Sequence, residues 1–371
     1  MFSFFYEDMD LEQLVKPHVL TQPVYQPGKP IETVARELGL NPSTIAKLAS
    51  NESPFGSSPK AIEAVREWLP EAWLYPDGSG YQLKEKLSQV RGVSPGQILL
   101  GNGSNEVIEL LGHAFLGNGD EVIFGEQAFI VYRLVSLLFG ATPVAVPMPN
   151  YSHDLQAMAD AVTEKTRMVF VASPNNPTGT ANSEAELIEF ARSLPESVIF
   201  CLDEAYAEYC DSPPDLRPLI EEGRNVICLR TFSKIYGLAG FRIGYGYASE
   251  EMVDLLNRVR QPFNCNAAAL VSAEAGLGDD EFVQNCKKQN RGNGALLLAG
   301  LRDLGLEVIE SEANFFLVGF ENAMDTFDLL QRNGVIVRPL QPYNLPNHLR
   351  ITIGTQDQNQ QLLTILQENL G

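Results

Sequence analysis

Positive charge is scarce in this sequence of 371 residues. It contains 27 lysines and arginines but 47 aspartates and glutamates, which gives a net charge of −20. A chain with this balance repels the phosphates of DNA and RNA unless its basic residues cluster, and no basic stripe runs along the sequence. Nucleic acid is therefore not an expected partner.

Cysteine and histidine are also infrequent. The five cysteines are odd in number, widely spaced and mostly inside apolar runs, as is typical of reduced core residues. The four histidines are scattered, and neither a CxxC pair nor an HExxH motif occurs. We therefore predict no metal site.

Long apolar runs are lacking as well. None reaches the roughly 20 residues that a membrane-spanning helix needs. The first ten residues, MFSFFYEDMD, lack the basic region and long apolar core of a signal peptide. We expect a cytoplasmic protein without a membrane partner.

The sequence does contain an alternation of short apolar runs with amphipathic segments. Strands that are apolar throughout and separated by helices are typical of an α/β fold with a mainly parallel sheet covered on both faces. After about residue 261, a helix and three further apolar runs predict a smaller α/β unit. The runs expected to form strands are residues 97–100, 121–124, 144–146, 168–172, 198–202, 226–229, 243–247, 314–318, 334–338 and 349–353.

Lys234 follows one of these runs and has neighbours suited to a phosphorylated aldehyde cofactor. The carboxyl ends of strands are where open α/β sheets hold ligands. Thr231 and Ser233 can donate to phosphate oxygens, and Arg242 can bind them in a bidentate manner. This arrangement fits pyridoxal 5′-phosphate, although a lysine near a serine is by itself commonplace on protein surfaces.

Two further strand ends carry polar residues. Asp203 ends the run VIFCLD and can pair with a pyridinium nitrogen, which stays protonated only beside a fixed anion. Tyr206 lies three residues later, within reach of a ring hydroxyl, and Asn176 lies in the turn after the run at 168–172. Each segment alone is also explained by ordinary strand-ending or turn chemistry.

Together, the order and spacing of the three strand ends resemble the fold-type I aminotransferases, which use pyridoxal 5′-phosphate. The resemblance implies that Lys234 bonds the cofactor aldehyde and that Asp203 binds the ring nitrogen. It assigns the ring oxygen to Asn176 and Tyr206. The phosphate would be bound by Ser233 and Arg242.

Further motifs extend the resemblance over nearly the whole chain, and they point to the histidinol-phosphate aminotransferase branch. They are LASNESP (48–54), YPDG (75–78), GNGSNE (101–106), VIVRP (335–339) and LRITIGT (349–355). The resemblance implies an N-terminal arm and part of a small domain at 1–40, a large cofactor-binding domain at 41–260 and the remaining small domain at 261–371.

Other roles follow from the same resemblance. Gly103, Ser104 and Asn105 open a helix whose amides can bind the cofactor phosphate. Phe129 would stack on the cofactor ring, although a core position is an equally good interpretation. Tyr75 would reach the cofactor phosphate of a neighbouring subunit, which implies a homodimer with shared sites.

The substrate side of the site is less specific. Arg338 and Arg350 match positions that bind a substrate phosphate or carboxylate, and Tyr25 and Asn314 match positions near the same pocket. The leading interpretation is transamination between histidinol phosphate and the 2-oxo acid 2-oxoglutarate. Aromatic amino-acid transamination, alone or alongside it, remains the alternative.

Two other functions are compatible with parts of this pattern. A phosphothreonine decarboxylase would use the same cofactor fold. A ligand-sensing domain of a transcription regulator is disfavoured, because the resemblance begins almost at residue 1 and the charge is acidic.

Overall fold

A seven-stranded sheet forms the centre of the larger part of the molecule, in a computed structural model that describes residues 10–25 and 28–370. Its order is β2-β8-β7-β6-β5-β3-β4. All neighbours are parallel except β8, which runs antiparallel to both β2 and β7. The strands are β2 (Ile98–Gly101), β3 (Glu121–Gly125), β4 (Thr142–Val146), β5 (Thr166–Ala172), β6 (Ile199–Asp203), β7 (Val226–Thr231) and β8 (Gly244–Tyr247).

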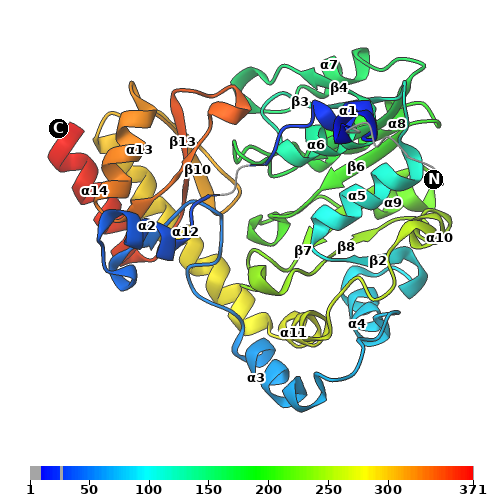
Figure 1. The fold of residues 1–371 in the computed structure, drawn as a ribbon, viewed down its shortest axis with the longest axis horizontal. Coiled ribbons are helices and arrows are strands. Elements are labelled where there is room, and N and C mark those ends of the chain that lie inside the picture. Colours follow the sequence, from blue (N-terminus) through cyan, green and yellow to red (C-terminus); the bar gives the residue numbers. More distant parts are fainter. Residues whose placement is uncertain (1–9, 26–27, 371) are drawn as a thin grey trace, which may run out of the picture.

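Helices cover both faces of this sheet, as Figure 1 shows. One apolar core lies beneath α5 (Ser104–Phe115), α6 (Ile130–Leu138) and α10 (Glu250–Val259). The core on the other face is formed with α3 (Pro59–Trp68), α4 (Tyr81–Arg91), α7 (Leu155–Asp160), α8 (Glu184–Ser193), α9 (Arg217–Glu221) and α11 (Ala267–Leu277). The sheet is therefore buried from both sides, as its uniformly apolar strands predict.

A four-stranded antiparallel sheet, β12-β13-β10-β9, forms the centre of a smaller unit. Its strands are β9 (Val308–Ile309), β10 (Phe315–Gly319), β12 (Arg338–Pro339) and β13 (His348–Thr352). Helices α12 (Asp280–Asp303), α13 (Ala323–Arg332) and α14 (Gln356–Leu370) accompany it. In Figure 1 the long helix α12 runs from the neighbourhood of α11 into this unit.

The N-terminal segment joins the smaller unit. Helix α2 (Ile31–Leu38) packs there, and β1 (Ala46–Lys47) pairs in parallel with β11 (Val335–Ile336). Helix α1 (Pro17–Leu20) instead lies near α6. The division into 1–40, 41–260 and 261–371 stays our proposal, and these contacts differ from it in favouring a first boundary near residue 50. Because α11 packs with α3 and α4, they also support a second boundary inside α12.

The seven apolar runs expected in the large sheet all form strands, which confirms the predicted fold class. The run at 334–338 is different, because it divides into β11 and β12. The chain changes partner there, from parallel β1 to antiparallel β13. Within residues 10–25 and 28–370, no helix is long and apolar enough to cross a membrane.

Candidate active site

A cavity of about 220 Å³ lies at the carboxyl ends of β5, β6 and β7, where the two units meet. It brings together side chains from segments that are far apart in the sequence. The predicted site residues that line it are Tyr25, Gly103, Ser104, Asn105, Phe129, Asn176, Asp203, Tyr206, Thr231, Ser233, Lys234, Arg242, Arg338 and Arg350.

Asp203, the last residue of β6, is held by two hydrogen bonds. Tyr132 Oη donates to its Oδ2 at 2.8 Å, and the backbone N–H of Ala205 donates to its Oδ1 at 3.1 Å. Burial raises the pKa of Asp203 above its usual value. The hydrogen bonds from Tyr132 and Ala205 act in the other direction and offset part of this rise. The carboxyl group lines the cavity with both oxygens already oriented.

Lys234 lies in the turn after β7 and points its amine into the same cavity. Its Nζ donates to the backbone oxygen of Ser50 at 3.4 Å and lies 5.5 Å from the centre of the Tyr206 ring. Burial and the nearby Arg350 guanidinium lower the pKa of Lys234 to about 8. A minority of this amine is therefore neutral near physiological pH, but far more than for an ordinary lysine, and the neutral amine is the nucleophile.

An anion-binding cradle adjoins the lysine. Gly103 has φ of +78° and directly precedes α5, so the amides of that helix's first turn face the cavity. Arg242, also left-handed with φ of +59°, donates to Ser233 Oγ at 3.4 Å. A Cβ at Gly103 would lie only 2.6 Å from Arg242 Nη2, so a side chain there would fill the cradle.

Arg350 on β13 forms the opposite part of the site. It donates to Asn176 Oδ1 at 2.6 Å, and its centre lies 5.4 Å from the ring of Phe315. Its Nε is buried without a hydrogen-bond partner among the residues that the structure describes. Burial lowers the pKa of Arg350, and this guanidinium is suited to an incoming anion.

Tyr206 is held from the small unit through Asn51. Asn51 Nδ2 donates to Tyr206 Oη at 2.8 Å, and Thr352 Oγ1 donates to Asn51 Oδ1 at 3.1 Å. Asn314 Nδ2 donates to the backbone oxygen of Asn51 at 3.1 Å. Asn314 is fully buried and does not line the cavity. It acts on the site only through Asn51. Burial raises the pKa of Tyr206 to about 12, which keeps its hydroxyl protonated.

Tyr75 does not line the cavity of its own chain. Its side chain is 84% exposed and stacks on Phe263, with ring centres 5.0 Å apart. Phe129, which directly precedes α6, does line the cavity, with its ring edge-to-face against Tyr132 at 5.7 Å.

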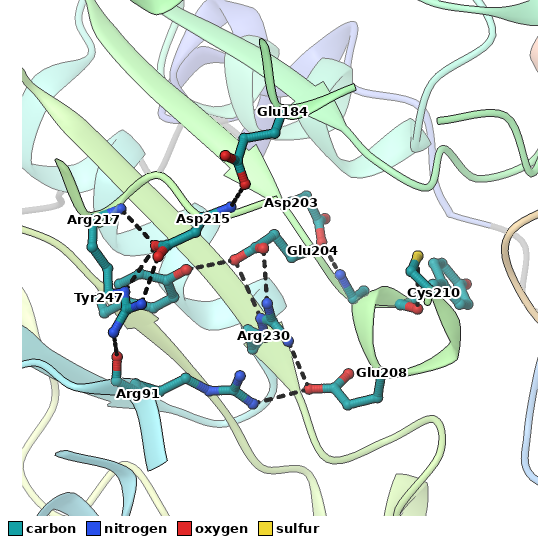
Figure 2. A network of polar contacts seen from close by, with 12 residues as sticks. Arg91, Glu184, Asp203, Glu204, Glu208, Cys210, Asp215, Arg217, Arg230 and Tyr247 are labelled. Atoms are coloured by element: carbon teal, nitrogen blue, oxygen red, sulfur yellow. Dashed lines mark hydrogen bonds and ion pairs between the residues drawn. The ribbon is translucent and has the colours of Figure 1, made fainter. Parts of the chain in front are cut away.

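A buried ionic network lies on the other face of the strand ends, because successive side chains of a strand point to opposite faces. Figure 2 shows Glu204, Arg230, Glu208 and Arg91 joined in this network. Arg230 binds Glu204 through two nitrogens at 2.9 and 3.2 Å and Glu208 through a third at 3.1 Å. Tyr247 Oη also donates to Glu204 at 2.8 Å. The network ties β6, β7 and β8 together next to Asp203.

Four polar residues of the cavity were not predicted as site residues, namely Ser50, Asn51, Tyr132 and Tyr343. Asn51 belongs to the motif at 48–54, so its motif was recognised but not its role. Tyr132 belongs to none of the recognised motifs, although it follows Phe129 by only three residues. Tyr343 carries no signal in the sequence, because only the folding of β12 towards β13 brings it to the cavity.

Comparisons with known proteins agree with this geometry. The profile of the family described as "Aminotransferase class I and II" matches residues 43–366. The chain is 46% identical to "Histidinol-phosphate aminotransferase 2" of Pseudomonas fluorescens, covering 98% of this chain and 99% of that one. It is 44% identical to "Histidinol-phosphate aminotransferase" of Akkermansia muciniphila, covering 98% and 100%.

The fold is also similar to that of a solved aminotransferase structure. The crystal structure of histidinol-phosphate aminotransferase from Sinorhizobium meliloti in complex with pyridoxal-5′-phosphate superposes with a TM-score of 0.89. The two chains are 27% identical, and the match covers 99% of this chain and 98% of that one. On the matching profile and the near full-length relatives, this chain belongs to the class I and II aminotransferases.

Proposed function

We propose that this protein transfers the amino group of histidinol phosphate to 2-oxoglutarate, using pyridoxal 5′-phosphate and giving imidazole acetol phosphate and glutamate, a step of histidine biosynthesis. The observation that carries the proposal is the meeting of Lys234, Asp203 and the Gly103–Arg242 cradle in one cavity. The names of the relatives at 44–46% identity support the choice of substrate.

The residues of the cavity fit the cofactor. The cradle at Gly103, closed by Arg242, has the donors and the space for a phosphate, which an added Cβ would remove. Asp203 offers a fixed carboxylate for a protonated ring nitrogen, and Lys234 offers an amine that is partly neutral. Tyr206 supplies a protonated hydroxyl for the ring oxygen. When bound, pyridoxal 5′-phosphate supplies an electron sink that makes the hydrogen on the substrate's α-carbon acidic.

The chain's own residues then perform binding and proton transfer. Lys234 Nζ would take the proton from the donor's α-carbon as a general base and give it to the cofactor's aldehyde carbon as a general acid, and the reverse transfer would serve the acceptor. Its lowered pKa of about 8 suits both tasks. Asp203 keeps the ring nitrogen protonated by remaining an anion.

Substrate anions are bound from the small unit. Arg350 and Arg338 present two guanidinium groups to the cavity, with Tyr343 and Tyr25 beside them. A phosphate on the amino donor and a carboxylate on the acceptor can use the same cations in turn. The aromatic alternative lacks comparable support, because the relatives named above carry the histidinol phosphate name.

The proposal is tested by measuring glutamate formation from 2-oxoglutarate with histidinol phosphate as donor. We expect turnover by the wild type and loss of at least about a thousandfold in Lys234→Ala, because the nucleophile and base are one group. Lys60→Ala is the matched control, since that lysine is 61% exposed and lies outside the cavity lining. Normal turnover by Lys234→Ala would refute the assignment.

A homodimer with a shared site is also part of the proposal. The exposed, stacked pair Tyr75 and Phe263 supports it, because large aromatic surface left in water is typical of interfaces. If Tyr75 serves the partner's cofactor, a hybrid of Tyr75→Phe and Lys234→Ala subunits regains one intact site. A hybrid that recovers neither activity nor cofactor affinity beyond its parents would place each site within one chain.

We further propose that the protein functions in the cytoplasm. All five cysteines are buried and unpaired, which suits a reducing compartment.

A further inference from the structure

We propose that Tyr132 is a positioning residue that holds Asp203 ionised and correctly oriented for the cofactor's ring nitrogen. This inference rests on the proposed function, because it assigns Asp203 to that nitrogen. It goes beyond it by giving a role in cofactor binding to a residue outside the motifs.

The contacts of Asp203 fix the plane of its carboxylate. Tyr132 Oη donates to Oδ2 at 2.8 Å, while the Ala205 N–H donates to Oδ1 at 3.1 Å. With one donor on each oxygen, rotation of the carboxylate would break both hydrogen bonds. Both oxygens keep a further lone pair for a donor in the cavity.

Tyr132 itself has little freedom to move. Its ring stacks on Phe170 with centres 4.5 Å apart and planes 4° from parallel. Phe129 packs against it edge-to-face at 5.7 Å, and the side chain is fully buried. The hydroxyl is therefore presented from a rigid support, as a residue that orients another group must be.

The charges around Asp203 show why this hydrogen bond matters. Burial raises the pKa of Asp203, the hydrogen bonds from Tyr132 and Ala205 lower it, and the neighbouring Glu204 raises it again. Burial also raises the pKa of Tyr132, which keeps its hydroxyl protonated and able to donate. The titratable groups that face Asp203 are Tyr132 from α6, Cys201 and Glu204 from β6 and its end, Tyr206, and Lys234.

The chain provides a matched control for the experiment. Tyr247 donates to Glu204 at 2.8 Å, so it is also a buried tyrosine bonded to a buried carboxylate. Glu204 directly follows Asp203 but belongs to the ionic network on the other face, and neither Glu204 nor Tyr247 lines the cavity. Replacement of either tyrosine by phenylalanine removes the same bond type and leaves the ring in place.

The test is the dissociation constant of pyridoxal 5′-phosphate, measured by absorbance for the wild type, Tyr132→Phe, Tyr247→Phe, Asp203→Asn and the double variant Tyr132→Phe/Asp203→Asn. We expect Tyr132→Phe to weaken cofactor binding about tenfold, the size typical of a hydrogen bond to a charged group. Tyr247→Phe should lower the melting temperature but leave the dissociation constant within about twofold. On the Asp203→Asn background, Tyr132→Phe should add nothing, because Tyr132 acts through the anion.

A pH profile separates this role from simple packing. Loss of the hydrogen bond raises the pKa of Asp203 further, so Tyr132→Phe should lose cofactor affinity at a higher pH than the wild type as the solution is acidified. The inference is overturned if the two tyrosine variants weaken binding equally, or if Tyr132→Phe weakens binding as much without Asp203 as with it. A wild type that does not bind the cofactor at all would instead refute the proposed function.

Discussion

Replacing Arg230 by methionine is expected to cost the folded protein about 3 kcal/mol. Arg230 is 4% exposed and makes three hydrogen bonds to Glu204 and Glu208. Burial lowers the pKa of Arg230, but the two carboxylates outweigh burial and raise it well above its usual range. Methionine retains much of the volume but leaves Glu204, which is fully buried, without its cation.

The magnitude follows from what remains around the two carboxylates. Removing one partner of a buried ion pair typically costs about 3–5 kcal/mol. The lower end applies here, because Tyr247 still donates to Glu204 and Arg91 still pairs with Glu208 at 3.2 Å. For a chain of 371 residues the unfolding entropy is roughly 0.8 kcal/mol/K, so the melting temperature should fall by about 4 °C.

Thermal unfolding followed by circular dichroism measures this change. Arg258→Met is the matched control, because Arg258 pairs with Asp254 at 2.8 Å on the surface with both side chains more than 60% exposed. It should change stability by less than about 0.5 kcal/mol. The double variant Glu204→Gln/Arg230→Met should recover part of the loss. Equal effects of Arg230→Met and Arg258→Met, or simple addition in the double variant, would show that the loss does not come from an unpaired buried carboxylate.

Three other outcomes follow from single residues. Burial lowers the pKa of His153 to about 4, so only the unfolded chain gains this proton between pH 6.5 and 4. Stability should therefore fall by up to about 3 kcal/mol as the pH drops through that range, and His153→Gln should flatten this slope in urea titrations. Gly103→Ala should weaken cofactor binding at least tenfold in an equilibrium titration, because its Cβ would meet Arg242 and its φ is +78°. Arg350→Met should raise the pKa of Lys234 above about 8 and shift the pH profile of cofactor binding towards alkaline values, and an unchanged profile would contradict this.

The sequence predicts the large sheet well because each of its strands is buried on both faces. Apolar runs such as 168–172 and 198–202 are typical of strands in such a sheet, and Asn176 and Asp203 follow these two runs. The small unit is harder to predict, because its strands depend on distant partners. The run at 334–338 is one example, because its first part, β11, pairs with β1 and its last residue begins β12, which pairs with β13.

Dependence on distant partners also explains which site residues could not be predicted from the sequence. Lys234, Asp203 and Arg242 belong to local motifs and line the cavity as predicted. Tyr132 looks like any apolar helix position until the fold brings it against Asp203. Asn314 matched a pocket position, but in the structure it supports Asn51 from behind.

Donor preference under single-turnover conditions distinguishes histidinol phosphate from aromatic amino acids as the substrate. The purified, cofactor-loaded protein is mixed separately with histidinol phosphate, phenylalanine, tyrosine and glutamate, without an acceptor, and the visible absorbance of the bound cofactor is followed. We expect histidinol phosphate to react far faster than either aromatic amino acid, because Arg338 and Arg350 would bind its phosphate. Rates for phenylalanine or tyrosine that match or exceed that of histidinol phosphate would instead assign the protein to aromatic transamination.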